Sequence, residues 1–137
     1  KTFINKSLSF LFLSLFSFNA YSADLIFKGF PTTKIEIAEG KSTTFSLNNK
    51  QTKEFAVIIE REDGKYYWRS RNNTELTPAQ SGAYVTYSAV NGSGYIRVYS
   101  DVMQEMYHKL SKEEQAKSHL YMEHLIHQLG SITYYGK

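Results

Sequence analysis

The sequence contains no cysteine, only two prolines and a single tryptophan among its 137 residues. Without cysteine the chain forms no disulfide bonds and has no site for lipid attachment through an N-terminal cysteine. Small secreted domains often rely on disulfides, but a chain of more than about 100 residues can be stabilised by a hydrophobic core alone. The absence of cysteine therefore indicates a fold that is held by packing and backbone pairing.

Long hydrophobic runs are also missing. The one clear apolar run, residues 8–18, is about half of the ~20 residues that a membrane-spanning helix needs. Lys1 and Lys6 precede this run, and small residues follow it before Asp24, the first acid. This order of basic, apolar and small residues predicts a secretory signal peptide over residues 1–23.

The expected cleavage position follows from the small residues near the end of this segment. Cleavage after Ser22 places Ala20 and Ser22 at the two small-residue positions, whereas cleavage after Ala23 would place the bulky Tyr21 at one of them. Residues 24–137 are then expected to form one exported globular domain without a stable membrane anchor. Its lack of cysteine fits a bacterial periplasm or the extracellular medium better than animal secretion.

The domain has almost no excess of charge of either sign. The whole chain carries 16 Lys and Arg against 13 Asp and Glu, a net charge of +3. Lys1 and Lys6 belong to the predicted signal peptide, so the remaining domain carries +1. A domain so close to neutral has little long-range attraction for nucleic acid or anionic lipid, and no nucleic-acid partner is expected.

The strongest secondary-structure pattern is a hairpin around Asp63-Gly64. Residues 54–62 and 65–71 alternate apolar and polar side chains on either side of this two-residue turn signal. A two-residue loop pairs Ile59 with Trp68, which sends Trp68 inward and Arg69 outward.

Other strand patterns occupy the rest of residues 25–99. Residues 35–37 and 45–47 alternate around a turn at Glu39-Gly40, and residues 83–90 and 94–100 alternate around Asn91-Gly92-Ser93. In the latter hairpin, Ile96 and Val98 are predicted to point to the side opposite Tyr95, Arg97 and Tyr99. Residues 72–82, which contain Pro78, are predicted to be a polar loop.

The pattern changes to a helical period after Ser100. Asp101 begins a predicted short helix, and Ser111 with Glu114 forms a capping box for a second helix that is expected to end near Leu129, before Gly130. Residues 132–135 return to strand composition. The sequence thus predicts an α+β fold, with antiparallel β-hairpins in a sheet or flattened sandwich, two C-terminal helices packed on one face, and a final short strand. The helices are expected to bury four apolar side chains against the sheet: Met103, Met106, Leu125 and Leu129.

Tyrosine and arginine are concentrated on strands that are predicted to share one sheet. Tyrosine offers a flat apolar ring with a hydroxyl group, and arginine offers a planar set of donors for carboxylate or phosphate. These residue types are favoured at protein interfaces, and they are also ordinary outward residues of half-exposed strands. The predicted ligand-binding residues are Tyr67, Arg69, Arg71, Tyr95, Arg97 and Tyr99.

A histidine-bearing segment near the C-terminus suggests different chemistry. On a helix, Glu123 and His127 lie one turn apart, as do His124 and His127, so either pair can reach one metal ion. A third ligand would have to come from elsewhere, and the alternative interpretation is a solvent-facing polar helix face. No metal ligands are assigned on this pattern, and no cofactor is expected.

No catalytic motif is present. A Gly-x-Ser-x-Gly nucleophile elbow is absent, and the glycine-rich segment at residues 91–94 lacks the lysine and the helix of a phosphate-binding loop. The sequence favours a small exported non-enzymatic binding module that uses the outward Tyr/Arg face for a glycan, a peptide or a protein partner. The alternative is a small secreted hydrolase, with metal assistance through the histidine-bearing helix.

Overall fold

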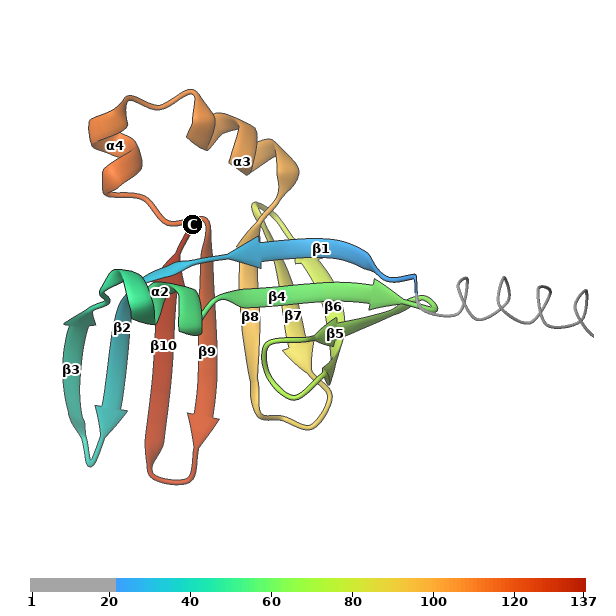
Figure 1. The fold of residues 1–137 in the computed structure, drawn as a ribbon, viewed down its shortest axis with the longest axis horizontal. Helices are drawn as coiled ribbons and strands as arrows, with labels where there is room; N and C mark the ends of the chain where they lie inside the picture. Colours follow the sequence, from blue (N-terminus) through green and yellow to red (C-terminus); the bar gives the residue numbers. More distant parts are fainter. Residues whose placement is uncertain (1–21) are drawn as a thin grey trace, which may run out of the picture.

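A computed structural model of the chain describes residues 22–137, which form one ten-stranded antiparallel sheet and three short helices (Figure 1). The strands are β1 (Asp24–Gly29), β2 (Pro31–Ala38), β3 (Lys41–Ser46), β4 (Val57–Glu62), β5 (Lys65–Trp68), β6 (Thr74–Ser81), β7 (Tyr84–Ala89), β8 (Gly94–Tyr99), β9 (Tyr121–His127) and β10 (Gly130–Gly136). The helices are α2 (Asn49–Glu54), α3 (Asp101–His108) and α4 (Lys112–Ala116). Apart from Ser22 and Ala23, the predicted signal peptide lies outside the described residues. Within residues 22–137, no helix has the length and apolar character needed to cross a membrane.

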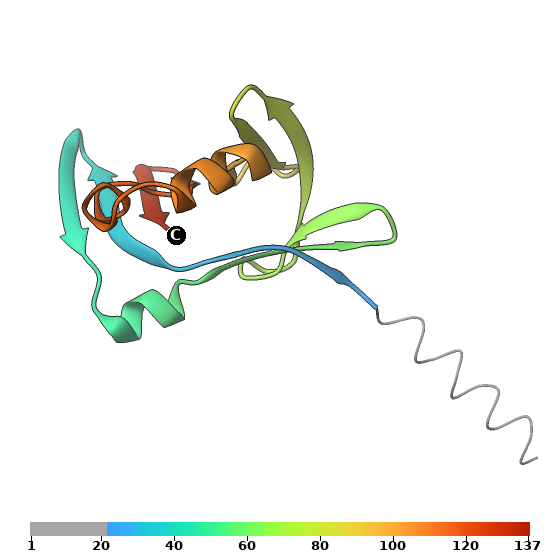
Figure 2. The ribbon, with the colours of Figure 1, turned by 90° about the horizontal axis from the view of Figure 1, so that it is seen from above.

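The sheet curls until its two ends are joined through one stretch of chain. The strand order is β1-β4-β5-β6-β7-β8-β9-β10-β2-β3, and β1 and β2 are consecutive strands separated only by Phe30. β1 pairs with β4 and β2 pairs with β10, so this stretch spans the distance between the two ends (Figure 2). Phe30 and Lys137 exchange two backbone hydrogen bonds of 2.9 and 3.1 Å at the junction. The curl encloses the inward side chains of both halves of the sheet.

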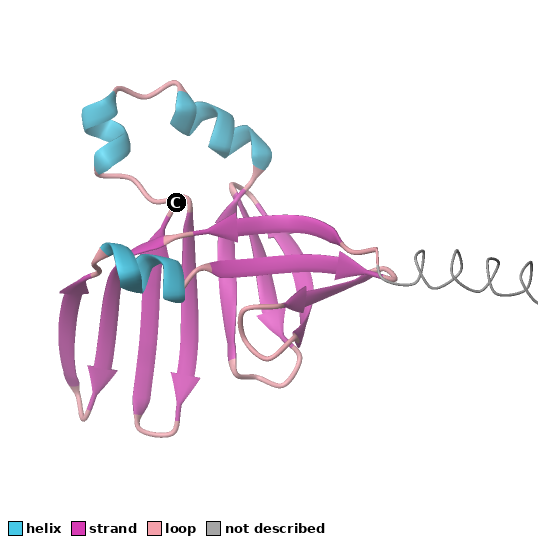
Figure 3. Cartoon of the chain, viewed as in Figure 1, coloured by secondary structure: helices cyan, strands magenta, loops and turns pink. Residues whose placement is uncertain are grey.

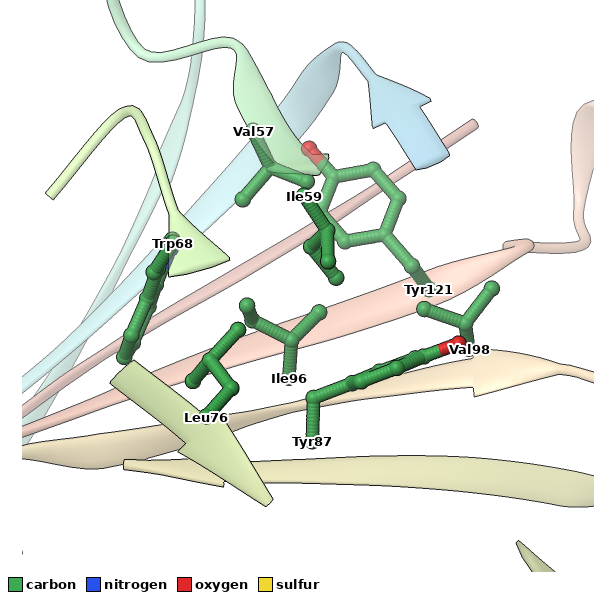
Figure 4. Close-up of a cluster of buried hydrophobic side chains, with 8 residues drawn as sticks. All are labelled: Val57, Ile59, Trp68, Leu76, Tyr87, Ile96, Val98 and Tyr121. Atoms are coloured by element: carbon green, nitrogen blue, oxygen red, sulfur yellow. The ribbon is translucent and has the colours of Figure 1, made fainter. Parts of the chain in front are cut away.

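The hydrophobic core lies inside this curl. Successive strand residues point to opposite faces, so every second residue of each strand faces inward. Trp68 is fully buried, and its indole nitrogen reaches from β5 to the carboxylate of Glu123 on β9. The buried cluster comprises Val57, Ile59, Trp68, Leu76, Tyr87, Ile96, Val98 and Tyr121 (Figure 4).

The predicted hairpin around Asp63-Gly64 is confirmed. Ile59 pairs with Trp68 in the β4–β5 ladder, as a two-residue loop requires. Asp63 and Gly64 have φ angles of 53° and 76°, the left-handed conformation that this turn needs and that glycine adopts without strain. Trp68 consequently points inward and Arg69 outward, as predicted.

Two other predicted hairpins are also present. The turn at Glu39-Gly40 joins β2 to β3, and the turn at residues 91–93 joins β7 to β8. In β8, Ile96 and Val98 are buried in the core. The predicted final strand lies within β10.

The prediction that residues 72–82 form a loop is wrong, because most of them form β6. Leu76 faces inward and is buried, which gives the segment a core anchor despite its polar composition. Pro78 is tolerated because β5 pairs with β6 only as far as Leu76. Beyond that point a missing backbone N–H loses no partner on the β5 side.

The prediction of a second helix ending near Leu129 is also wrong. Helical structure in this region is limited to α4, and residues 121–127 form strand β9 between β8 and β10. The apolar residues of this segment fit both a helical and a strand period, and pairing with two neighbouring strands selects the strand. The coarse α+β description holds, with a sheet that dominates the fold and short helices beside it.

The helices do not cover a sheet face as expected. α3 and α4 form an arch over one end of the curled sheet (Figures 2 and 3). Met106 and Leu129 are 55% and 82% exposed, so the predicted burial of Met103, Met106, Leu125 and Leu129 between helices and sheet does not occur. The arch leaves the outer face of the central strands open.

Candidate binding cleft

The face of the sheet opposite the core is defined by strand register. Arg97 of β8 pairs with Thr86 of β7 on one side and with Met122 of β9 on the other. Tyr95 pairs with His124 of β9 in the same way. Because paired residues share a face, these side chains all point away from the buried Ile96. We call this surface, over β7, β8, β9, β10, β2 and β3, the outer face.

The outer face has no acidic side chain on these six strands. Glu36 of β2 and Glu123 of β9 point to the inner face, and the outward acids of the sheet lie on strands beyond this surface: Glu75 on β6, opposite Tyr67, and Glu60 and Glu62 on β4. The outward residues are Tyr84, Thr86, Ser88, Tyr95, Arg97, Tyr99, Met122, His124, Ile126, Ser131, Thr133, Tyr135, Thr33, Ile35, Ile37, Ser42, Thr44 and Ser46. The surface is therefore aromatic, hydroxyl-bearing and without negative charge.

One end of the outer face is hollowed into a cleft of about 360 Å³. The floor comes from β7, β8, β9 and β10, and one wall comes from the chain that leaves α4 and enters β9. The lining residues are Tyr84, Arg97, Tyr99, Lys117, Ser118, His119, Leu120, Tyr121, Met122 and Tyr135. We call this hollow the aromatic cleft. It contains basic and aromatic groups and no carboxylate.

Tyrosine rings surround Arg97 in and beside the aromatic cleft. The rings of Tyr84 and Tyr99 lie 4.8 Å apart at an angle of 19°, and their hydroxyl oxygens are 3.4 Å apart. The hydrogen bond with Tyr84, followed by partial burial, raises the pKa of Tyr99, which keeps this hydroxyl protonated. The Arg97 guanidinium lies 5.6 Å from the ring centres of both Tyr84 and Tyr95. Ring contacts of this kind hold a guanidinium in place without using its hydrogen-bond donors.

Arg97 differs in this respect from the other three arginines of the chain. Arg61 pairs with Asp24, Arg69 with two glutamates of β4, and Arg71 with Glu123. Within residues 22–137, Arg97 has neither a carboxylate partner nor a side-chain hydrogen bond. Its donors are free to receive a ligand.

The remaining basic groups of the cleft differ in charge. The ring of His119 lies 5.2 Å from that of Tyr135, and burial, with a smaller contribution from Lys137, lowers the pKa of His119. His119 is thus neutral at pH 7 and offers a hydrogen bond but no charge. Lys117 is exposed and reaches only Glu113, at 3.8 Å across one helical turn. The positive charge of the cleft comes from Arg97 and Lys117.

No protein-family model, curated protein or solved structure matches this chain. Function is therefore inferred from the chemistry of the outer face. Three of the predicted residues, Tyr95, Arg97 and Tyr99, come together there.

The other predicted outward pair, Tyr67 and Arg69, forms a separate patch. Arg69 stacks over Tyr67 at 4.6 Å and donates hydrogen bonds of 2.9 Å to Glu60 and to Glu62. β5 is three strand positions from β8, about 14 Å along the sheet at the usual strand spacing. Arg69 is neutralised by its own neighbours, so this patch fits the interpretation of ordinary outward sheet residues.

The prediction that Arg71 lies on the same face is wrong. β5 ends at Trp68, and Asn72 and Asn73 take left-handed φ angles of 56° and 53° that turn the chain. Before these asparagines, the Arg71 N–H donates a hydrogen bond of 3.0 Å to the Trp68 carbonyl in a turn, and the Arg71 side chain reaches Glu123 of β9, with 3.2 Å from its Nη2 to Oε1. Its side chain is 31% exposed and lies at the border of the core rather than on the outer face.

Glu123 is the unexpected feature of the core, at 1% exposed. Its Oε2 accepts a hydrogen bond of 2.8 Å from the indole nitrogen of Trp68, and Arg71 supplies the compensating charge. Burial raises the pKa of Glu123, and Arg71 opposes this effect. These contacts account for an acid among apolar side chains.

The predicted helical grouping of Glu123, His124 and His127 is also wrong. On strand β9, Glu123 points inward and His124 outward, where its Nδ1 lies 2.9 Å from Oγ1 of Thr133. Among the described residues, no group of three or more His, Asp or Glu side chains is arranged to hold a metal ion. The hydrolase alternative loses the arrangement on which it depended.

A larger hollow of about 860 Å³ lies between β1, the β6–β7 turn and the start of α3. Leu25, Phe27, Val85 and Val98 give it an apolar lining, and Asp101 is the only charged residue at its border. It shares only Tyr99 with the predicted residues. Such a lining supplies van der Waals contact with few groups to orient a ligand.

Several residues of the aromatic cleft were not predicted from the sequence. Tyr84 could have been predicted, because the hairpin turn at residues 91–93 places it opposite Tyr99. His119 and Tyr135 could not have been predicted, because they join the cleft only through the pairing of β9 with β10. A helical interpretation of residues 111–129 removes that pairing.

Proposed function

We propose that the protein is a small exported non-enzymatic binding module whose outer face recognises a glycan, a peptide or a protein partner through the aromatic cleft. The observation that carries this proposal is Arg97, an arginine with unused donors between two tyrosine rings. Export is supported by the order of basic, apolar and small residues in positions 1–23.

Recognition by the aromatic cleft requires little rearrangement. The stacked rings of Tyr84 and Tyr99 and the contacts of Arg97 are already formed without a ligand. Side chains that are ordered before binding lose less conformational entropy on binding. Interfaces are enriched in tyrosine and arginine for related reasons, since both give large contact areas with directional donors.

The expected result for Arg97→Ala is a loss of at least about tenfold in affinity, because a charge-assisted hydrogen bond contributes about 1.5–3 kcal/mol. A glycan array and a peptide array, both probed with labelled protein, supply the ligands, and titration calorimetry of the best binder measures the effect. The fold should be unchanged, because Arg97 makes no ion pair within residues 22–137.

Arg61→Ala is the matched control. Arg61 is also an exposed strand arginine, but it lies on β4 and pairs with Asp24 at 2.9 Å. Its removal should leave the affinity of the same binder unchanged. Equal affinities of Arg97→Ala and the unmodified protein for every array binder, or no binder on either array, would contradict the proposal.

A further inference from the structure

We infer that the ligand of the outer face is an acidic glycan, a chain of sugar units that carries carboxylate or sulfate groups. The inference rests on the proposed function, since it names the class of molecule that the aromatic cleft receives. It follows from three properties of the outer face: its charge, its surface chemistry and the saturation of its backbone.

The charge of the surface favours an anion. The chain carries 13 acids, yet none lies outward on β7, β8, β9, β10, β2 or β3. Arg97 and Lys117 supply local positive charge within a domain that is nearly neutral overall. A planar guanidinium with free donors matches the two oxygens of a carboxylate or sulfate group. The attraction for an anion therefore comes from the charge and the directed donors of the cleft and not from the net charge of the domain.

The surface chemistry favours a molecule that is rich in hydroxyl groups. The residues Tyr84, Tyr95 and Tyr135 are at least partly exposed, and the ring atoms that their neighbours leave uncovered can pack against the C–H groups of a sugar. Hydroxyl and imidazole groups lie beside these rings. One of them is the imidazole of His124, which is oriented by its contact with Thr133. Alternating rings and polar groups suit a polar chain with apolar ring faces.

The surface also continues beyond the aromatic cleft. Strand register aligns Tyr95, His124, Thr133, Ile35 and Thr44 in one row that crosses β8, β9, β10, β2 and β3. From β8 to β2 this row covers about 14 Å at the usual strand spacing. Thr133 itself is buried, so a ligand of several linked units contacts the cleft together with the partly exposed members of the row, whereas a single sugar fills only the cleft.

The backbone of these strands argues against an extended peptide. A peptide that adds to a sheet needs an unpaired strand edge, and β8, β9 and β10 each have a neighbour on both sides. The two edge strands of the sheet are β1 and β3, and neither contributes a residue to the lining of the aromatic cleft. A ligand at Arg97 must bind through side chains, as a glycan does.

The test uses acidic oligosaccharides with uncharged counterparts of equal length. The probes are tetramers of galacturonate, mannuronate, hyaluronan and heparin, each compared by titration calorimetry at pH 7 with a form in which every carboxylate is methyl-esterified and, for heparin, every sulfate is also removed and the freed amines are acetylated. We expect at least one acid form to bind at least tenfold more tightly than its neutral form. The preference should disappear in Arg97→Gln and persist in Arg61→Gln, and galacturonate or another uronate monomer should bind more weakly than the tetramer.

The outcomes separate this inference from the proposed function. Equal affinity for acid and neutral forms overturns the acidic specificity, as does binding that Arg97→Gln leaves unchanged. If no acidic tetramer binds, but a peptide or protein binds and is lost in Arg97→Ala, the glycan inference fails and the proposed function stands. If no acidic tetramer binds and no array ligand depends on Arg97, both fail.

Discussion

Arg71→Met is expected to destabilise the fold by about 3 kcal/mol at pH 7, as measured by chemical denaturation. The substitution keeps most of the aliphatic bulk and removes the charge that faces Glu123. Glu123 is almost fully buried and retains only the indole hydrogen bond of Trp68. An ionised carboxylate without a partner is costly in such a site.

The destabilisation should decrease as the pH is lowered. Burial already raises the pKa of Glu123, and loss of Arg71 removes the group that opposes this rise. Between the pKa of Glu123 in the unmodified protein and its higher pKa in the variant, the folded variant binds a proton that neither the folded unmodified protein nor the unfolded chain binds. Stability relative to the unmodified protein is thus recovered as the pH falls through that interval, and is lost above it.

Two further variants control this experiment. Arg61→Met removes an exposed, solvent-screened ion pair with Asp24 and should change stability far less than Arg71→Met. Glu123→Gln combined with Arg71→Met should recover most of the lost stability, because the amide oxygen still accepts from Trp68 and no charge remains buried. A loss equal to that of Arg61→Met, or a loss independent of pH, would contradict the assigned role of Arg71.

Trp68→Ala is expected to destabilise the fold by about 4 kcal/mol, the other large effect. Trp68 is fully buried, and its removal leaves a cavity within the core cluster. It also removes a hydrogen bond to the carboxylate of Glu123. Denaturation followed by far-UV circular dichroism measures the change, since the chain has no other tryptophan to report by fluorescence.

Tyr84→Ala is the matched aromatic control, because Tyr84 lies on the outer face and is 36% exposed. Its loss should destabilise the fold by about 1 kcal/mol or less. Trp68→Phe keeps a ring in the core and should lose roughly half as much stability as Trp68→Ala, which preserves a measurable folded state. Similar stabilities of Trp68→Ala and Tyr84→Ala would contradict the place of Trp68 in the core.

The sequence was sufficient where local turn chemistry determines the register. Asp63-Gly64 demands a tight hairpin, and once that turn is fixed the alternation of side chains sends Trp68 inward and Arg69 outward. The turn at residues 91–93 does the same for Arg97 and its tyrosine neighbours. Local signals thus predicted the part of the outer face that lies on β8.

The sequence was insufficient where distant segments decide the structure. Residues 121–127 fit a helix by period, and they become strand β9 because β8 and β10 supply backbone partners on both sides. Closure of the sheet through Phe30 and Lys137 is equally non-local. For the same reason Glu123 was assigned to a polar helix face, and His119 and Tyr135 were not connected with Arg97.

The side chain of Arg71 shows a third kind of limit. Its alternation with Arg69 predicts an outward position only while the strand continues. β5 stops at Trp68, and two left-handed asparagines then redirect the chain. A strand end is set by pairing with a neighbour, which composition near the end does not reveal.

The most direct test of the central claim is a nuclear magnetic resonance titration of the ¹⁵N-labelled protein with the tightest-binding acidic tetramer. We expect the Nε–Hε signal of Arg97 and the amide signals of Tyr95, Tyr99 and Met122 to shift together, while the indole signal of Trp68 stays in place. Shifts confined to the apolar hollow around Val98 and Met103, or an unmoved Arg97 signal at saturation, would contradict this claim.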